Sequence, residues 1–208
     1  MLQNRLLRLI NGLLSPIRLI IPQPFVNFIP GLMTNYDIRT AIVLEAIPNR
    51  ATILDIGCGT NRLVRKHQER GGKGVGVDIH DWGDVDMLVE DSSNLPLEND
   101  SFDVVTFVAC LNHIPNRESV LQEAVRVLKP NGVIVSTNLT PTISKIWRKI
   151  AWWDSDQHER GMEEGEVWGF TDSEFRHLLN GAGLKVIDAR PFSWGLNRCY
   201  RARKQCAG

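Results

Sequence analysis

The chain has 208 residues, enough for one domain with a large hydrophobic core. Its 24 basic and 24 acidic side chains cancel, so net charge does not point to a nucleic-acid partner. No apolar run of about 18 residues is free of charge and proline, so no membrane-spanning helix is predicted. The four cysteines form no C-x-x-C pair, which predicts free thiols in the reducing cytoplasm.

Residues 1–33 form a segment that differs from the rest. Their apolar side chains recur at helical spacing and arginines are their only charged side chains, while Pro22, Pro24 and Pro30 limit any helix. This pattern predicts a helical segment packed on the domain or on a second subunit, which would make the chain a homodimer. A lid, or a basic anchor lying on a membrane surface, is the alternative.

Residues 34–208 are predicted to form one domain in which strands and helices alternate. Such alternation predicts a parallel sheet with right-handed crossover connections. The predicted helices are Asn35–Ile47, Arg62–Arg70, a helix capped by Asn116 and running to about Leu128, and one from a Thr171/Glu174 capping box to Asn180. The predicted strands are Thr52–Ile56, Lys73–Ile79, Val85–Val89, Phe102–Val108, Val133–Thr137, Leu184–Ala189 and Gly195–Arg203.

A glycine turn follows the first predicted strand. Gly57 and Gly59 permit a tight bend with backbone close to a ligand, and Thr60 or Asn61 can cap the next helix. Strand, turn and helix N-terminus together predict a nucleotide-cofactor cradle. Asp78 ends the next strand 21 residues after Gly57, the spacing at which a carboxylate can bind both ribose hydroxyls.

Four motifs in this order carry a family resemblance: LDIGCG, GVGVDI, EDSSNLPLENDSFDVV and EAVRVLKPNGVIV. Across residues 51–137 they resemble class I S-adenosylmethionine-dependent methyltransferases of the methyltransferase-11 type. The resemblance implies a Rossmann-like, doubly wound α/β fold, mostly parallel with an antiparallel last strand and helices on both faces. It also implies methyl transfer from S-adenosyl-L-methionine, and it departs from the family where Asn61 replaces a usual third glycine.

The resemblance assigns cofactor contacts position by position. The methionine part of the cofactor would bind at the first motif, and the ribose would bind the acid of the second. The adenine amino group would lie near the acid of the third motif. The sulfonium end would face the residues after the fourth strand. The implied cofactor residues are Asp55, Gly57, Cys58, Gly59, Asp78, Ile79, Asp91, Ser92, Ala109 and Cys110. Leu111 follows in the same stretch, and His113 occupies the position of a frequent family histidine.

Several of these residues could instead have a purely structural role. Asp91 could be a turn residue, Cys58 and Cys110 are expected to be small buried packing residues, and His113 could be a structural hydrogen-bond donor. Two functional alternatives also remain: an NAD-type dinucleotide-binding oxidoreductase, and a non-catalytic interaction module. Arg62 argues against the first, because the dinucleotide fingerprint requires a glycine there.

Residues 138–170 are predicted to form a substrate lid. Tryptophans alternate there with charged side chains, a composition typical of a cover over a partly apolar small molecule. His158 and Glu159 join His113 as candidate general bases, and no metal site is expected. The expected acceptor is a small molecule, with a hydroxyl on a glycan, a lipid-linked intermediate or a secondary metabolite as the methylated group.

Overall fold

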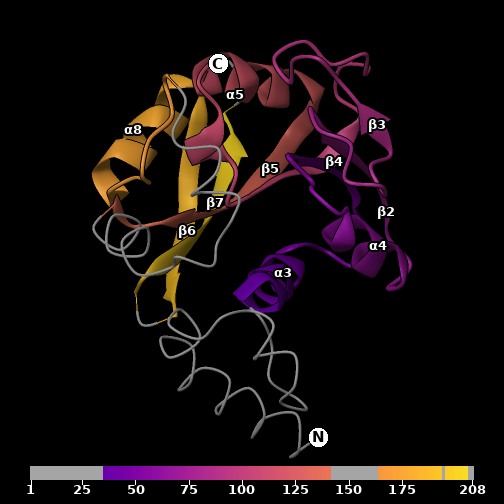
Figure 1. The fold of residues 1–208 in the computed structure, drawn as a ribbon, viewed down its shortest axis with the longest axis horizontal. Coiled ribbons are helices and arrows are strands. Elements are labelled where there is room, and N and C mark those ends of the chain that lie inside the picture. The colour runs from indigo at the N-terminus through magenta and orange to yellow at the C-terminus, as the bar shows by residue number, and fades with distance from the viewer. Residues whose placement is uncertain (1–34, 142–163, 194, 206–208) are drawn as a thin grey trace, which may run out of the picture.

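The computed structural model describes residues 35–141, 164–193 and 195–205. They build a seven-stranded sheet with the strand order β3-β2-β1-β4-β5-β7-β6 (Figure 1). The strands are β1 (Thr52–Ile56), β2 (Lys73–Asp78), β3 (Met87–Leu88), β4 (Phe102–Val108), β5 (Leu128–Leu139), β6 (Leu184–Phe192) and β7 (Asn197–Lys204). The helices are α3 (Asn35–Ala46), α4 (Arg62–Gln68), α5 (Arg117–Val127), α8 (Asp172–Gly181) and the short 3₁₀ helix η1 (Leu111–His113).

The first five strands run parallel, which confirms the predicted fold class. β7 pairs antiparallel with β5, and β6 pairs antiparallel with β7, as the resemblance implied. Within the sheet, β2 and β3 follow on one side of β1, and the chain then crosses to β4 on the other side of β1. The order therefore reverses between β1 and β4, and open α/β sheets bind ligands at the carboxyl ends of the strands beside such a reversal.

Helices cover both faces of the sheet. On one face, α3 and α4 contribute Val43 and Leu63 to a cluster that includes Val104 of β4. On the other face, α5 and α8 contribute Leu121 and Phe175 to the larger cluster. Side chains alternate between these clusters along the strands, as expected for a sheet buried on both sides.

Several predicted boundaries were wrong at their ends. α4 stops at Gln68, two residues before the predicted end, and β3 contains only two residues. β6 continues three residues further than predicted, to Phe192. These differences arise at element ends, where local pattern is weakest.

The predicted turn before the fifth strand instead lies inside β5. Phe102 pairs with Leu128 and Val104 pairs with Val133, so the two strands change register across residues 129–132. Asn131 has a φ of 66°, which accommodates this irregularity. Pro130 and Gly132 thus mark a bulge in a long strand rather than its start.

Two segments of functional interest lie outside the described residues. Residues 1–34 contain the predicted N-terminal segment, and residues 142–163 contain most of the predicted lid, including His158 and Glu159. Among the helices of the described ranges, none has the length and apolar character needed to cross a membrane.

Candidate cofactor and acceptor site

The glycine turn joins β1 to α4 at the carboxyl edge of the sheet. Gly57 and Gly59 have φ angles of +71° and +54°, in the left-handed region that glycine adopts without strain. A Cβ at Gly57 would lie 2.8 Å from the Cβ of Cys110, so the turn packs directly on that residue. A Cβ at Gly59 would meet nothing within 4 Å. The backbone at Gly59 therefore borders open space in which a ligand can approach it.

Asp78 at the end of β2 is hydrogen-bonded to this turn. Its buried carboxylate accepts hydrogen bonds from the backbone N–H of Gly59 at 2.8 Å and from that of His80 at 3.0 Å. Ile79 stands beside it with half of its surface exposed (52%). An apolar side chain and a carboxylate thus lie side by side at the strand end where the resemblance expects a ribose and its base.

Asp55 is the second acid of the site and is buried. The hydroxyl of Thr106 on β4 donates to it at 2.6 Å. Burial raises the pKa of Asp55 from 3.8 to about 7, the Thr106 hydrogen bond opposes that rise, and the nearby charge of Asp78 adds to it. The carboxyl therefore changes protonation near neutral pH, and a cation beside it would favour its ionised form.

Asn61 occupies the N-cap position of α4, but its side chain makes no capping hydrogen bond. It adopts a left-handed φ of 55°, and its side-chain amide donates to the backbone oxygen of Asp84 at 2.9 Å and to the carboxylate of Asp86 at 2.8 Å. The asparagine thus takes the left-handed backbone that the family's usual third glycine would take. Unlike glycine, asparagine has an amide side chain, and this side chain holds the loop that follows β2 through Asp84 and Asp86.

Asp91 belongs to a loop that is hydrogen-bonded to Asn116 at the start of α5. Its exposed carboxylate accepts from the backbone N–H of Ser93 at 2.8 Å, the Ser93 hydroxyl at 2.6 Å and the Asn116 amide at 3.1 Å. These bonds, led by the Ser93 hydroxyl, hold the pKa of Asp91 below its usual value. Asn116 thus binds Asp91 rather than capping α5, while Ser92 beside them is buried. The adenine contact of Asp91 and Ser92 stays a prediction.

A second clamp holds the same loop further along. Glu123 of α5 accepts from the backbone N–H of Leu95 at 2.7 Å, and it also pairs with Arg126. Arg126 in turn donates to the backbone oxygens of Leu95 and Leu97. The helix therefore determines where the loop after Asp91 lies.

Ala109 and Cys110 line the turn from the side of β4. Ala109 has a φ of 56°, and its N–H donates to the backbone oxygen of Thr137. Burial and the charges of Asp55 and Asp78 raise the pKa of the Cys110 thiol, and burial does the same for Cys58. Both thiols are protonated at neutral pH, which agrees with packing roles and not with nucleophilic ones.

His113 ends η1 and faces an acid that the sequence did not single out from the other charged lid residues. The Nδ1 atom of His113 lies 3.6 Å from Oε1 of Glu166, whose side chain is only 1% exposed. The His113 side chain is 35% exposed. The structure thus places a histidine and a carboxylate together near the end of β4.

Residues 165–170, here called the strap, connect the predicted lid to α8. The Val167 N–H donates to the Asn112 oxygen at 2.9 Å, and the Phe170 N–H donates to the Leu139 oxygen at 3.3 Å. Arg117 of α5 donates to the Gly165 oxygen. The strap therefore lies against the carboxyl ends of β4 and β5.

Asn138 brings a further polar group to this edge. It lies four residues after Ile134 on β5, so its side chain is on the sheet face that α5 and α8 cover. It is 3% exposed, and neither its amide nitrogen nor its oxygen has a hydrogen-bond partner. A buried amide without partners is costly, which points to a bound group that supplies them.

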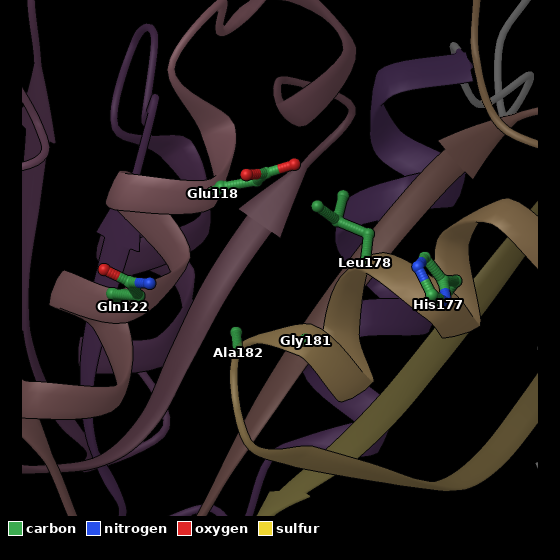
Figure 2. Close-up of a pocket in the computed structure, with 6 residues that line it drawn as sticks. All are labelled: Glu118, Gln122, His177, Leu178, Gly181 and Ala182. Carbon is green, nitrogen blue, oxygen red and sulfur yellow. The ribbon is translucent and has the colours of Figure 1, made fainter.

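Two surface hollows formed by described residues are not this site. One, of about 180 Å³, lies between α5 and α8. Figure 2 shows its lining, with Glu118 and Gln122 on the side of α5 and Leu178 and Ala182 on the side of α8. Another lies at the opposite, amino edge of the sheet, beside Pro48. Neither includes a predicted cofactor residue, so neither is a candidate for the methyl-transfer site.

Comparison with known families identifies the chain. The family model "Methyltransferase domain" of the methyltransferase-11 type matches residues 54–136, which include the turn, both buried acids and η1. The chain is a class I S-adenosylmethionine-dependent methyltransferase. The family settles the reaction class and the cofactor, and it excludes the oxidoreductase alternative.

Individual relatives of this methyltransferase agree with the match. A demethylmenaquinone methyltransferase of Staphylococcus saprophyticus is 28% identical over 69% of this chain and 74% of its own length. A phthiotriol/phenolphthiotriol dimycocerosates methyltransferase of Mycobacterium ulcerans is 38% identical, over 37% of this chain and 27% of its own. The solved structure of a Methanosarcina mazei SAM-dependent methyltransferase shares the fold, with a TM-score of 0.62, 22% identity, and coverage of 80% of this chain and 98% of that one.

Proposed function

We propose that the methyltransferase moves a methyl group to a hydroxyl-bearing, lipid-linked small molecule, with His113 as the general base. The observation that carries this proposal is the position of His113, partly exposed and backed by a buried carboxylate near the strand end that the cofactor's sulfonium would face. The names of the two curated relatives support a lipid-linked acceptor.

The residues present fit S-adenosylmethionine. Open space at Gly59 leaves room for the cofactor chain against backbone, and Asp78 lies within hydrogen-bond reach of that turn. Asp55, in its ionised form, would attract a cationic group from below the turn. We assign these three residues to the methionine and ribose parts of the cofactor, with Asp91 and Ile79 toward its adenine.

The chain's own residues would supply alignment and a proton acceptor. The cofactor, when bound, presents a methyl carbon on a positively charged sulfur, ready for in-line displacement. Alignment of two reactants can supply roughly 7–11 kcal/mol of the barrier, and a general base about 10²–10⁴-fold in rate. His113 would take the proton of the acceptor hydroxyl, and the strap would keep water away from the same edge of the sheet.

Asn138 is proposed to orient the acceptor. Its buried amide can donate to one oxygen of a substrate and accept from another. An acceptor ring with a hydroxyl and a second oxygen would satisfy both. Deprotonation of a ring hydroxyl activates either that oxygen or a neighbouring ring carbon. Analysis of the methylated product identifies which of these two atoms receives the methyl group.

The test uses demethylmenaquinone as the probe acceptor. Purified full-length protein is incubated with S-adenosylmethionine and the probe, in reduced and in oxidised form, and S-adenosylhomocysteine and methylated product are measured. The reduced ring carries the hydroxyl proton, so only this form is expected to react. His113→Asn should lower turnover about 10²-fold or more while cofactor affinity stays unchanged. Equal turnover in His113→Asn would remove the base from the proposal.

A further inference from the structure

Nδ1 is the ring nitrogen of His113 that lies toward Glu166. Nδ1 of His113 is buried and has no hydrogen-bond partner, and it lies 3.6 Å from Oε1 of Glu166. The side chain as a whole is nevertheless 35% exposed. Nδ1 contributes almost nothing to that exposure, so the exposed surface belongs to the other atoms of the side chain.

Glu166 is held in place by the strap. The residue before it is bound through its backbone oxygen to Arg117, and the N–H of the residue after it is bound to Asn112, the neighbour of His113. Burial lowers the pKa of Arg117, and the carboxylates of Glu118 and Glu166 act in the opposite direction. Glu166 therefore lies within electrostatic reach of both Arg117 and His113.

We propose that Glu166 is a positioning residue for His113, an inference that rests on the proposed function. The carboxylate accepts the Nδ1 proton, which fixes the tautomer whose unprotonated Nε2 faces the acceptor. The proton of the acceptor hydroxyl then passes to Nε2 as the new bond to the methyl carbon forms. The carbon–sulfur bond breaks, and its electron pair stays on sulfur. Glu166 stabilises the resulting imidazolium.

The distance of 3.6 Å between Nδ1 and Oε1 is longer than a hydrogen bond. Catalytic hydrogen bonds are often long before substrate binds and shorten in the complex. The strap is already bonded to Asn112 and Leu139, so a small shift of the two side chains is enough to bring the carboxylate to Nδ1.

The matched variants are Glu166→Gln and Glu164→Gln. Each removes one negative charge from the same stretch of chain, but Glu164 is exposed and lies just before the strap. Glu166→Gln should lower turnover of reduced demethylmenaquinone on the order of tenfold to a hundredfold, with cofactor affinity by calorimetry unchanged. Glu164→Gln should match the wild type in both.

Two further readouts separate positioning from a merely structural role. In ¹⁵N-labelled protein, with the His113 signals assigned from His113→Gln, the wild type should show the proton on Nδ1, and Glu166→Gln should show a mixture of tautomers. Glu166→Gln in a His113→Gln background should cost no further turnover, because the two residues act as one unit. Wild-type tautomer populations in Glu166→Gln, or additive losses, would overturn the proposal.

Failure of the proposed function gives a different result. If the wild type releases no S-adenosylhomocysteine with the probe, the acceptor assignment fails, and the tautomer measurement alone still decides the pairing. If the wild type is active and Glu166→Gln is equally active, the acceptor assignment survives and the role of Glu166 is refuted.

Discussion

The buried carboxyl of Asp55 makes stability depend on pH in a way that one substitution should remove. Its pKa is raised from 3.8 to about 7, so between these values the folded protein holds a proton that the unfolded chain releases. The folded state therefore loses stability as pH rises through that window, by about 1.4 kcal/mol per pH unit. From about pH 5 to about pH 8 the loss attributable to Asp55 is about 2.5 kcal/mol.

Asp55→Asn removes this titration while keeping the side chain's size. We measure the free energy of unfolding of both proteins by chemical denaturation. The value for the variant minus that for the wild type should rise by about 2.5 kcal/mol between about pH 5 and about pH 8. Asp91→Asn is the control, because hydrogen bonds lower the pKa of Asp91 and its titration ends below this window. A stability difference between Asp55→Asn and wild type that does not change with pH would refute the reasoning.

Two further predictions concern the same turn. Asp78→Ala should weaken S-adenosylmethionine binding by about 1–3 kcal/mol in calorimetry, while Asp81→Ala, an exposed acid on the same loop, should not. Affinity equal to wild type would place Asp78 outside the cofactor site. Gly57→Ala should lower the free energy of unfolding by about 2–4 kcal/mol, because it combines a left-handed φ with a Cβ 2.8 Å from Cys110. Gly59→Ala has the first penalty and not the second, so an equal loss in both variants would refute the contact argument.

The parts of the fold that could be predicted from the sequence are those that local pattern determines. β1 and β4 are short apolar runs closed by turn residues, and their bounds agree with the structure. The capping box of Thr171 and Glu174 opens α8 as predicted, because it involves only residues three apart. The glycine turn and Asp78 were predicted from spacing alone, and the structure joins them by a hydrogen bond.

The remaining features depend on partners that are distant in sequence. Asn61 was predicted to cap a helix, but its backbone is left-handed and its side-chain amide donates to Asp86, 25 positions away. Asn116 likewise binds Asp91 instead of its own helix. Glu166 was one of several acids in a charged stretch, and only the path of the strap shows which of them reaches His113. Side-chain choices of this kind are decided by tertiary contacts that periodicity does not encode.

The energetics of Asp55 connect these observations to function. A buried acid whose pKa is raised to about 7 destabilises the fold at neutral pH, and an amide of the same shape would avoid that cost. The charge of Asp78 adds to the rise, so the two carboxylates share one region of the site. A cation placed between them would stabilise both ionised forms at once. S-adenosylmethionine carries two positive groups, the sulfonium and the amino group of its methionine part, and its product lacks the sulfonium charge. The two acids would therefore favour the substrate form of the cofactor over the product form, which assists release after each transfer.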